Sequence, residues 1–182
     1  SDASAVDTGY SDGSDWYFQM VFCATTVSIV SGTLAERIKL WPFFLFAAIL
    51  SGIIYPIVMG WQWGGGWLAS AGFSDFAGST LVHAVGGWGA LVVIYFLGAR
   101  KGRFGKGGGA IPGSNIPLSA AGVMILWLGW FGFNGGSVLS ADPALTSVTL
   151  VNTCLAAAAG GLSCAGLYKV FYGKADIMMF MN

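Results

Sequence analysis

Charged residues are scarce in this sequence, and their scarcity excludes most classes of protein. Asp, Glu, Lys and Arg make up 9% of the 182 residues, against about 25% in an average soluble domain. Disorder is excluded as well, because a disordered chain needs low hydrophobicity, and 55% of these residues are hydrophobic. Eight Lys and Arg against eight Asp and Glu leave no basic excess for binding nucleic acid. The composition is that of an integral membrane protein.

The side chains that most enzymes and metal sites need are also few. The sequence has one His and three Cys, and it contains no CxxC, Gly-x-Ser-x-Gly, P-loop or zinc-ligand spacing. Cys154 and Cys164 are about 15 Å apart along one predicted helix, which is too far for a disulfide. We therefore expect no enzymatic activity, no cofactor and no metal.

Long stretches without charge predict an all-α integral membrane protein with five transmembrane helices. An apolar helix needs roughly 20 residues to cross about 30 Å of hydrocarbon. The stretches are continuous, whereas a membrane β-barrel would show alternating strands of about 10 residues. Gly-rich turns and prolines separate the stretches. The predicted spans are 16–36, 41–60, 79–98, 117–138 and 147–172.

The signs of the charges predict the orientation of these spans. In an up-and-down topology all eight cations lie on one side: Arg37, Lys39, Arg100, Lys101, Arg103, Lys106, Lys169 and Lys174. The other side has no cation and carries Asp2, Asp7, Asp12, Asp15, Asp75 and Asp142. Because basic loops stay in the cytoplasm, we expect the N-terminus outside and the C-terminus inside.

The same pattern predicts three segments. Residues 1–15 are expected to form an external loop, 16–174 the five-span membrane segment, and 175–182 a cytoplasmic lead-in to a further helix. The acidic start is unlike a signal peptide, and the apolar end at 177–181 suggests another span. We therefore expect a piece of a longer protein; the alternative is a natural five-span protein with short tails.

Two ionisable residues are predicted to lie near or within the third span. Burying such a group in a membrane costs a few kcal/mol, so His83 favours a functional role, as a neutral imidazole in a pore, over a purely structural one. Asp75 can cap the helix or make an external entrance favourable to cations. If both lay on one α-helix, they would be about 12 Å apart and within about 80° around it, and could border one pore.

Aromatic residues are concentrated in the outer third of the predicted spans. Trp61, Trp63 and Trp67 lie in an expected external loop, Phe22 lies in the first span, and Phe131, Phe133 and Ser137 lie near the outer end of the fourth. Trp commonly marks the membrane interface and Phe faces lipid or other helices. An aromatic surface can also hold a cation, and the spacing of Phe133 and Ser137 puts both on one helix face.

Small residues in the third span have a simpler interpretation. Gly86, Gly87 and Gly89 are expected to let helix backbones approach closely.

The stretch DFAGSTLVHAVGGWGALVVIYFLGAR, residues 75–100, resembles the signature of the Amt branch of the Amt/Mep/Rh ammonium transporter family. The resemblance includes Asp-Phe-Ala-Gly, a His eight residues after the Asp, paired small residues and a closing Gly-x-Arg. Further similar blocks, among them GWFGFNGGS at 129–137, follow in the order found in the family and cover nearly the whole chain after Ser14.

This resemblance implies roles for individual residues. Phe22, Trp63 and Ser137 match an external vestibule that recruits ammonium, with Asp75 supporting it from beneath. Phe22 and Phe133 match two stacked rings that gate the pore, His83 matches the first of two pore histidines, and Gln19 matches a pore-lining Gln. The resemblance further implies that ammonium loses its proton at the vestibule and passes as ammonia, with the proton moving separately in at least some members.

The family fold implies a larger assembly. Its members have about eleven spans in two inverted five-helix halves, and the five spans here match the third to the seventh, so the second pore histidine is absent. The family is trimeric, and a PII-type regulator can dock on its cytoplasmic face. The alternatives to a transporter are an ammonium-sensing membrane domain joined to a cytosolic signalling output, and a structural membrane fragment without a working pore.

Overall fold

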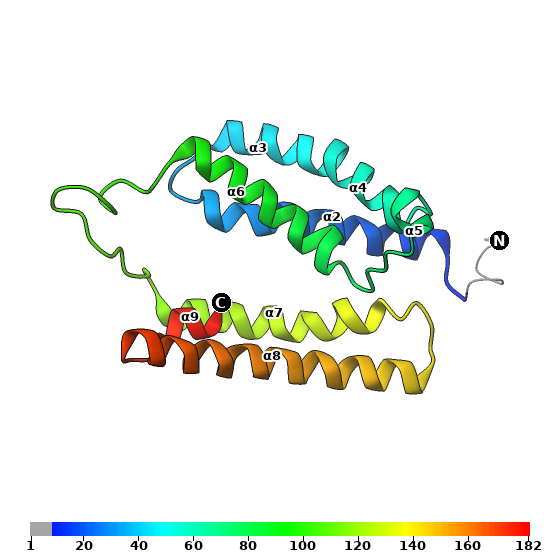
Figure 1. Ribbon diagram of the computed structural model, residues 1–182. Helices are drawn as coiled ribbons and strands as arrows, with labels where there is room; N and C mark the ends of the chain where they lie inside the picture. Colours follow the sequence, from blue (N-terminus) through cyan, green and yellow to red (C-terminus); the bar gives the residue numbers. More distant parts are fainter. Residues whose placement is uncertain (1–8) are drawn as a thin grey trace. The chain divides into compact units, whose positions relative to one another are not determined.

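A computed structural model describes residues 9–182, and within that range the regular secondary structure is helical, with no strand (Figure 1). Five helical stretches are long and apolar enough to cross a membrane: Asp12–Leu34, Leu40–Ser70, Ser79–Leu97, Ile116–Gly136 and Pro143–Tyr172. The predicted all-α fold with five spans is confirmed. Asp2, Asp7 and the first eight residues of the expected external loop lie outside the described residues.

The chain divides into two compact units, one ending at Ala110 and the other formed by Ile111–Asn182. The helices of the first unit are α2 (Asp12–Leu34), α3 (Leu40–Ile49), α4 (Tyr55–Gln62), α5 (Trp67–Ser70) and α6 (Val85–Leu97), with the π-helical turns η1 (Leu50–Ile54) and η2 (Ser79–Ala84). Those of the second are α7 (Ile116–Gly136), α8 (Pro143–Tyr172) and α9 (Ile177–Met181).

Capping side chains explain why two spans begin earlier than predicted. Helix α2 starts at Asp12 rather than at residue 16, because the Ser11 hydroxyl accepts from the Ser14 N–H and two acidic residues lie in the first turn. Helix α8 starts at Pro143 rather than at residue 147, because Asp142 accepts from the Leu145 N–H at 2.8 Å. Hydropathy locates the apolar stretch, while the capping residue fixes the first turn.

The second span is continuous from Leu40 to Gln62 although it contains Pro56. Proline has no N–H and normally kinks or ends a helix. The π-helical turn η1 lies immediately before it, and the Tyr55 N–H bonds the Leu50 carbonyl five residues back. This wider turn accommodates the proline without interrupting the span. The span then continues into the Trp-rich segment. Trp61 lies in α4 and Trp67 begins α5, so the expected loop is reduced to the turn at residues 63–66.

The core of the first unit lies where α2 packs along α6, with Leu50 of η1 beside them. Val30, Leu34, Leu50 and Ala90 form its buried apolar cluster. Gly86 allows the close approach, because a Cβ there would lie 2.9 Å from both the Ile29 Cβ and the Thr26 carbonyl oxygen. A Cβ on Gly87 would meet nothing within 4 Å. Close packing is therefore a property of Gly86 and not of every glycine in this span.

Gly86→Ala is expected to destabilise the first unit by about 1–3 kcal/mol, because the backbone of α2 and the β-branched Ile29 cannot move aside easily. Thermal unfolding in detergent measures the effect. Gly87→Ala is the matched control, since it adds the same methyl group one residue away in open space. Equal losses of stability in the two variants would contradict the packing role of Gly86.

Two arginines join the ends of α2 and α6 at the basic end of the first unit. The Arg37 guanidinium donates to the Gly98 carbonyl at 2.9 Å and to the Thr33 carbonyl at 2.7 Å. Arg100 forms an ion pair with Glu36 at 3.2 Å and donates to the carbonyls of Gly32 and Ala35 at 3.4 Å. These cations satisfy terminal carbonyls and favour the negative ends of the helix dipoles.

The second unit is a pair of long helices with a short third helix against them. The Asn134 amide of α7 donates to the Thr153 hydroxyl of α8 at 3.0 Å, and a Cβ on Gly135 would lie 3.1 Å from Leu150. The Phe180 ring of α9 packs on Gly161. No residue of α7 is buried.

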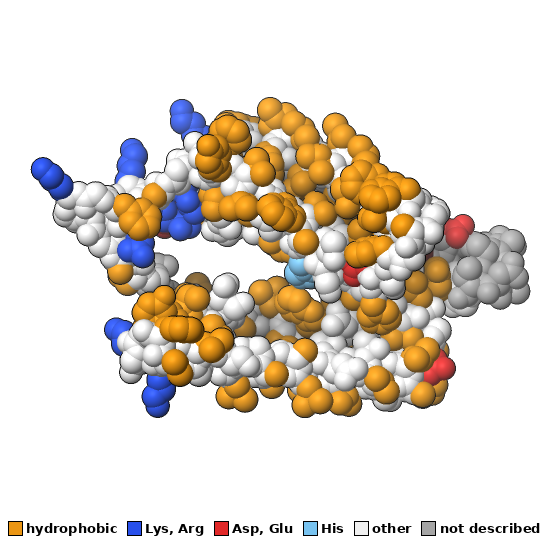
Figure 2. Space-filling model, in the orientation of Figure 1, with side chains coloured by type: hydrophobic (Ala, Val, Ile, Leu, Met, Phe, Trp, Pro, Cys, Tyr) orange, Lys and Arg blue, Asp and Glu red, His pale blue; other side chains and the backbone are white. Residues whose placement is uncertain are grey.

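Apolar side chains cover the outside of both units (Figure 2). In each unit Lys and Arg gather at one end of the helices. The described carboxylates lie at the other end, except Glu36 in the first unit and Asp176 in the second. An exposed apolar surface between two polar ends suits a lipid bilayer. The chain is a multi-pass membrane protein.

Candidate functional site

The Asp75 carboxylate fixes the backbone at the start of the third span. Asp75 is 7% exposed. Its Oδ1 accepts from the N–H groups of Gly78 and Ser79 at 2.7 and 3.1 Å, and its Oδ2 accepts from those of Thr80 and Leu81 at 2.9 and 2.8 Å. One side chain therefore satisfies the four N–H groups that begin the third span.

This geometry corrects the expectation that Asp75 and His83 lie on one α-helix. Asp75 precedes the helix, and the first turns, Ser79–Ala84, are π-helical. The carboxylate folds back onto the start of the helix and does not point along it. A carboxylate with four N–H partners supports the surrounding backbone, and it is poorly placed to meet an ion directly.

Gly78 makes this arrangement possible. Its φ of +99° is left-handed, and a Cβ there would lie 2.5 Å from Val82 Cγ2 and 2.9 Å from Val82 Cβ. Only glycine adopts this conformation without strain or overlap.

His83 lies on η2 and is partly buried. Its Nδ1 is 3.2 Å from the Gly78 carbonyl oxygen. A carbonyl oxygen only accepts hydrogen bonds, so this contact requires a proton on Nδ1, and in the neutral ring Nε2 is then the acceptor nitrogen.

The rings of Phe22 and Trp63 meet above this turn. Phe22 of α2 is 2% exposed, and its ring centroid lies 5.7 Å from that of Trp63. Trp63, directly after α4, donates its indole N–H to the Asp75 carbonyl oxygen at 2.8 Å. Residues far apart in the sequence therefore lie close together. Phe22 contacts Trp63, Trp63 bonds Asp75, and Asp75 bonds the turn that carries His83.

Two further residues belong to this region and were not predicted. The Phe18 ring packs edge-on against Phe22 with centroids 4.6 Å apart; its position one helical turn before Phe22 was the available signal. Tyr55 is 1% exposed, and its hydroxyl has no hydrogen-bond partner. Gln19, predicted to line the pore, is partly buried, and its Oε1 also has no partner.

Phe133 and Ser137 belong to the second unit. Ser137 follows α7, and its hydroxyl donates to the Phe133 backbone carbonyl at 2.8 Å. The Phe133 ring centroid is 6.2 Å from that of Trp130. Because the two units are described separately, stacking of Phe133 on Phe22 stays a prediction, as does a shared vestibule with Ser137.

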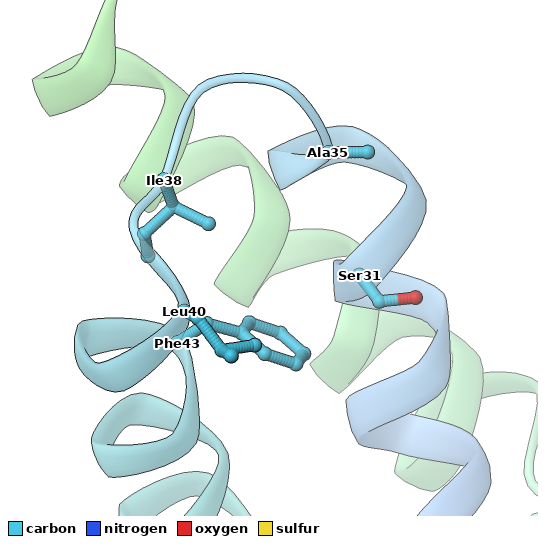
Figure 3. A pocket seen from close by; sticks show the side chains of 5 residues that line it. All are labelled: Ser31, Ala35, Ile38, Leu40 and Phe43. Atoms are coloured by element: carbon cyan, nitrogen blue, oxygen red, sulfur yellow. The ribbon is translucent and has the colours of Figure 1, made fainter.

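A hollow of about 190 Å³ lies elsewhere, between the end of α2 and the start of α3 (Figure 3). Ser31 lines it from α2, Leu40 and Phe43 from α3, and Ala35 and Ile38 from the connection between them. Its one polar side chain, Ser31, already donates to the Ser28 carbonyl at 2.6 Å. It contains none of the predicted site residues.

Comparisons with known proteins agree with the sequence resemblance. The model of the Ammonium Transporter Family matches residues 1–182. The ammonium transporter Amt2 of Archaeoglobus fulgidus is 45% identical over 179 residues, which cover 92% of this chain and 38% of that protein. The chain thus spans about two-fifths of the length of this curated relative.

Two solved structures are similar over most of the chain. A structure described as a sensor Amt protein has a TM-score of 0.86 and 37% identity, and the match covers 92% of this chain and 44% of that one. A variant of Candida albicans Mep2 has a TM-score of 0.77 and 34% identity, covering 88% and 36% respectively. The curated relatives are named as ammonium transporters and not as enzymes. The chain belongs to the ammonium transporter family, on its Amt side.

Proposed function

We propose that the protein moves ammonium across a membrane. It recruits the cation at an outer aromatic site and conducts neutral ammonia through the pore beyond that site. Phe22 and Trp63, together with the Ser137 hydroxyl, form the recruitment site, and Asp75 supports it. Phe22 and Phe133 form the gate, Gln19 lines the outer region beside it, and His83 is the pore histidine below. The proton moves separately.

The bonding around Asp75 carries this proposal. The carboxylate accepts from the turn that carries His83, while the backbone carbonyl of the same residue accepts from the Trp63 indole. An aromatic surface and an imidazole are therefore held at fixed positions by one residue. Ring faces attract a cation by about 0.5–2 kcal/mol, which permits recruitment without a counter-ion that would trap it.

The energetics of the membrane favour the neutral species beyond that point. Moving a full charge to the membrane centre costs far more than moving a small neutral amine. A cation site followed by an apolar gate and an uncharged imidazole selects for an ion that can lose its proton. Potassium has a similar radius but no proton to lose, so deprotonation rather than affinity becomes the filter.

The test uses the complete gene product in proteoliposomes. An inward ammonium gradient is expected to give saturable uptake or current, and an equal potassium gradient is expected to give none above protein-free vesicles. Equal responses to both ions would contradict the deprotonation filter. Absence of any saturable ammonium response would overturn the proposal.

A sensing role is the second candidate, and one observation favours it: the similar solved structure is described as a sensor Amt protein. A sensor is expected to bind ammonium with little or no flux. Calorimetric ammonium binding by a protein that gives no response in the same vesicles would favour sensing over transport.

The proposal includes a cellular setting. The separation of charges supports a cell membrane location with the N-terminus outside and the C-terminus in the cytoplasm. The family resemblance supports a homotrimer. The exposed basic loop after α6, with Lys101, Arg103 and Lys106, supports contact with anionic headgroups or with a PII-type regulator.

A further inference from the structure

One carbonyl of the second span lacks both of the regular backbone donors. In an α-helix the Ser51 carbonyl would accept from the Tyr55 N–H, but that N–H bonds the Leu50 carbonyl in the π-helical turn η1. A continuing π-helical turn would supply the N–H of residue 56 instead, and residue 56 is a proline, which has none. The backbone of η1 therefore leaves the Ser51 carbonyl to a donor from outside the span.

The donor comes from α2. The Cys23 thiol lies 3.1 Å from the Ser51 carbonyl oxygen and donates to it. Both residues are partly buried, and a buried carbonyl without a partner costs free energy. An S–H group is a weak donor, but a hydrogen bond is worth more in the low dielectric of an apolar span than in water. The thiol therefore satisfies a group that the span itself cannot.

Neighbouring side chains of α2 show that the direction of this bond is not a consequence of local helix geometry. The hydroxyls of Thr25 and Thr26 donate to carbonyls of their own helix, four residues back, at 2.8 and 3.2 Å. The Cys23 thiol instead donates to a residue 28 positions later, on a different span. The free carbonyl of η1 is the feature that explains this choice.

We propose that the Cys23 thiol takes the place of the N–H that Pro56 lacks, and that it holds the second span in its π-helical register against α2. A return to the α-helical register would turn the helix after η1 by about 100°, the rotation of one residue. Trp63 directly follows that helix, so the register also fixes where its ring lies relative to Phe22. The bond is independent of whether the protein conducts ammonium.

Infrared spectroscopy of the complete gene product in lipid measures this bond directly. Stretching bands of S–H groups lie where other protein groups do not absorb, and hydrogen bonding lowers their wavenumber. The Cys23 band is identified by its loss in Cys23→Ala. It is expected at a lower wavenumber than the band of an alkanethiol in an apolar solvent.

A double-mutant cycle tests the link to the proline. Cys23→Ala is expected to lower Tm in detergent by about 2–4 °C, as the loss of one hydrogen bond does, and Cys23→Ser, which keeps a donor, is expected to lower it less. In Pro56→Ala the span can satisfy Ser51 from its own backbone, through the new N–H or by a return to the α-helical register. Cys23→Ala is then expected to cost at most half as much.

Cys164→Ala is the matched control, because the Cys164 thiol also donates to a backbone carbonyl of another helix, that of Met179 in α9, at 3.0 Å. Its effect on Tm should be the same with Pro or Ala at residue 56. A Cys23 band at the position of a non-bonded thiol, equal losses in Cys23→Ala and Cys23→Ser, or an undiminished loss in the Pro56→Ala background would overturn the proposal. If Pro56→Ala does not fold, the first two measurements decide.

Discussion

Asp75→Ala is expected to lower the free energy of unfolding of the first unit by about 4 kcal/mol or more. The substitution removes the acceptor of four N–H groups at the start of η2, and each donor left unpaired in a buried place costs about 1–3 kcal/mol. Water can reach only part of this site, because Asp75 itself is 7% exposed.

Thermal unfolding in detergent, followed by tryptophan fluorescence, measures this loss. Asp142→Ala is the matched control: that carboxylate caps α8 through a single N–H, from Leu145, and its removal is expected to cost about 1 kcal/mol. Equal shifts of Tm in the two variants would show that the four bonds to Asp75 do not act as described.

His83→Leu is expected to lower ammonium flux roughly tenfold or more, because it removes the one imidazole in the span, and a lost hydrogen bond of about 1.4 kcal/mol corresponds to a factor of ten. Leu fills the space left by the ring, so the helix should still fold.

Ammonium uptake into proteoliposomes at matched protein content tests this, with Tm measured on the same samples. His83→Gln is the informative partner, because an amide donates and accepts hydrogen bonds but takes up no proton at neutral pH. A higher ammonium flux in the His83→Gln variant than in the His83→Leu variant would support a hydrogen-bonding role. Wild-type flux through the Leu variant would contradict any role of His83 in the pore.

The number of spans and their approximate extent could be predicted because they depend on hydropathy summed over about twenty residues. Such a sum tolerates error at single positions. Their first turns could not be predicted in the same way, because Ser11 and Asp142 fix them through single side-chain hydrogen bonds. A π-helical turn is harder still, since the choice between bonds to the fourth and the fifth residue depends on packing.

At the candidate site, too, some features could be predicted from the sequence and others could not. His83 and Asp75 are visible in the sequence because a polar residue in an apolar stretch requires an explanation. The position of Asp75 ahead of the helix depends on the left-handed Gly78, and the pairing of Trp63 with its backbone carbonyl depends on the fold of the segment between them. Phe18 and Tyr55 look like ordinary apolar positions until their neighbours are known.

The Arg37 side chain has a consequence for the order of assembly. It fastens α2 to the Gly98 carbonyl, which lies 61 residues later in the chain. During synthesis α2 emerges long before α6 exists, so its last carbonyls must first be solvated by water or headgroups. Arg37 can complete its bonds only after α6 has crossed the membrane. The bond to Gly98, unlike the local bond to Thr33, therefore forms only when the third span has been inserted.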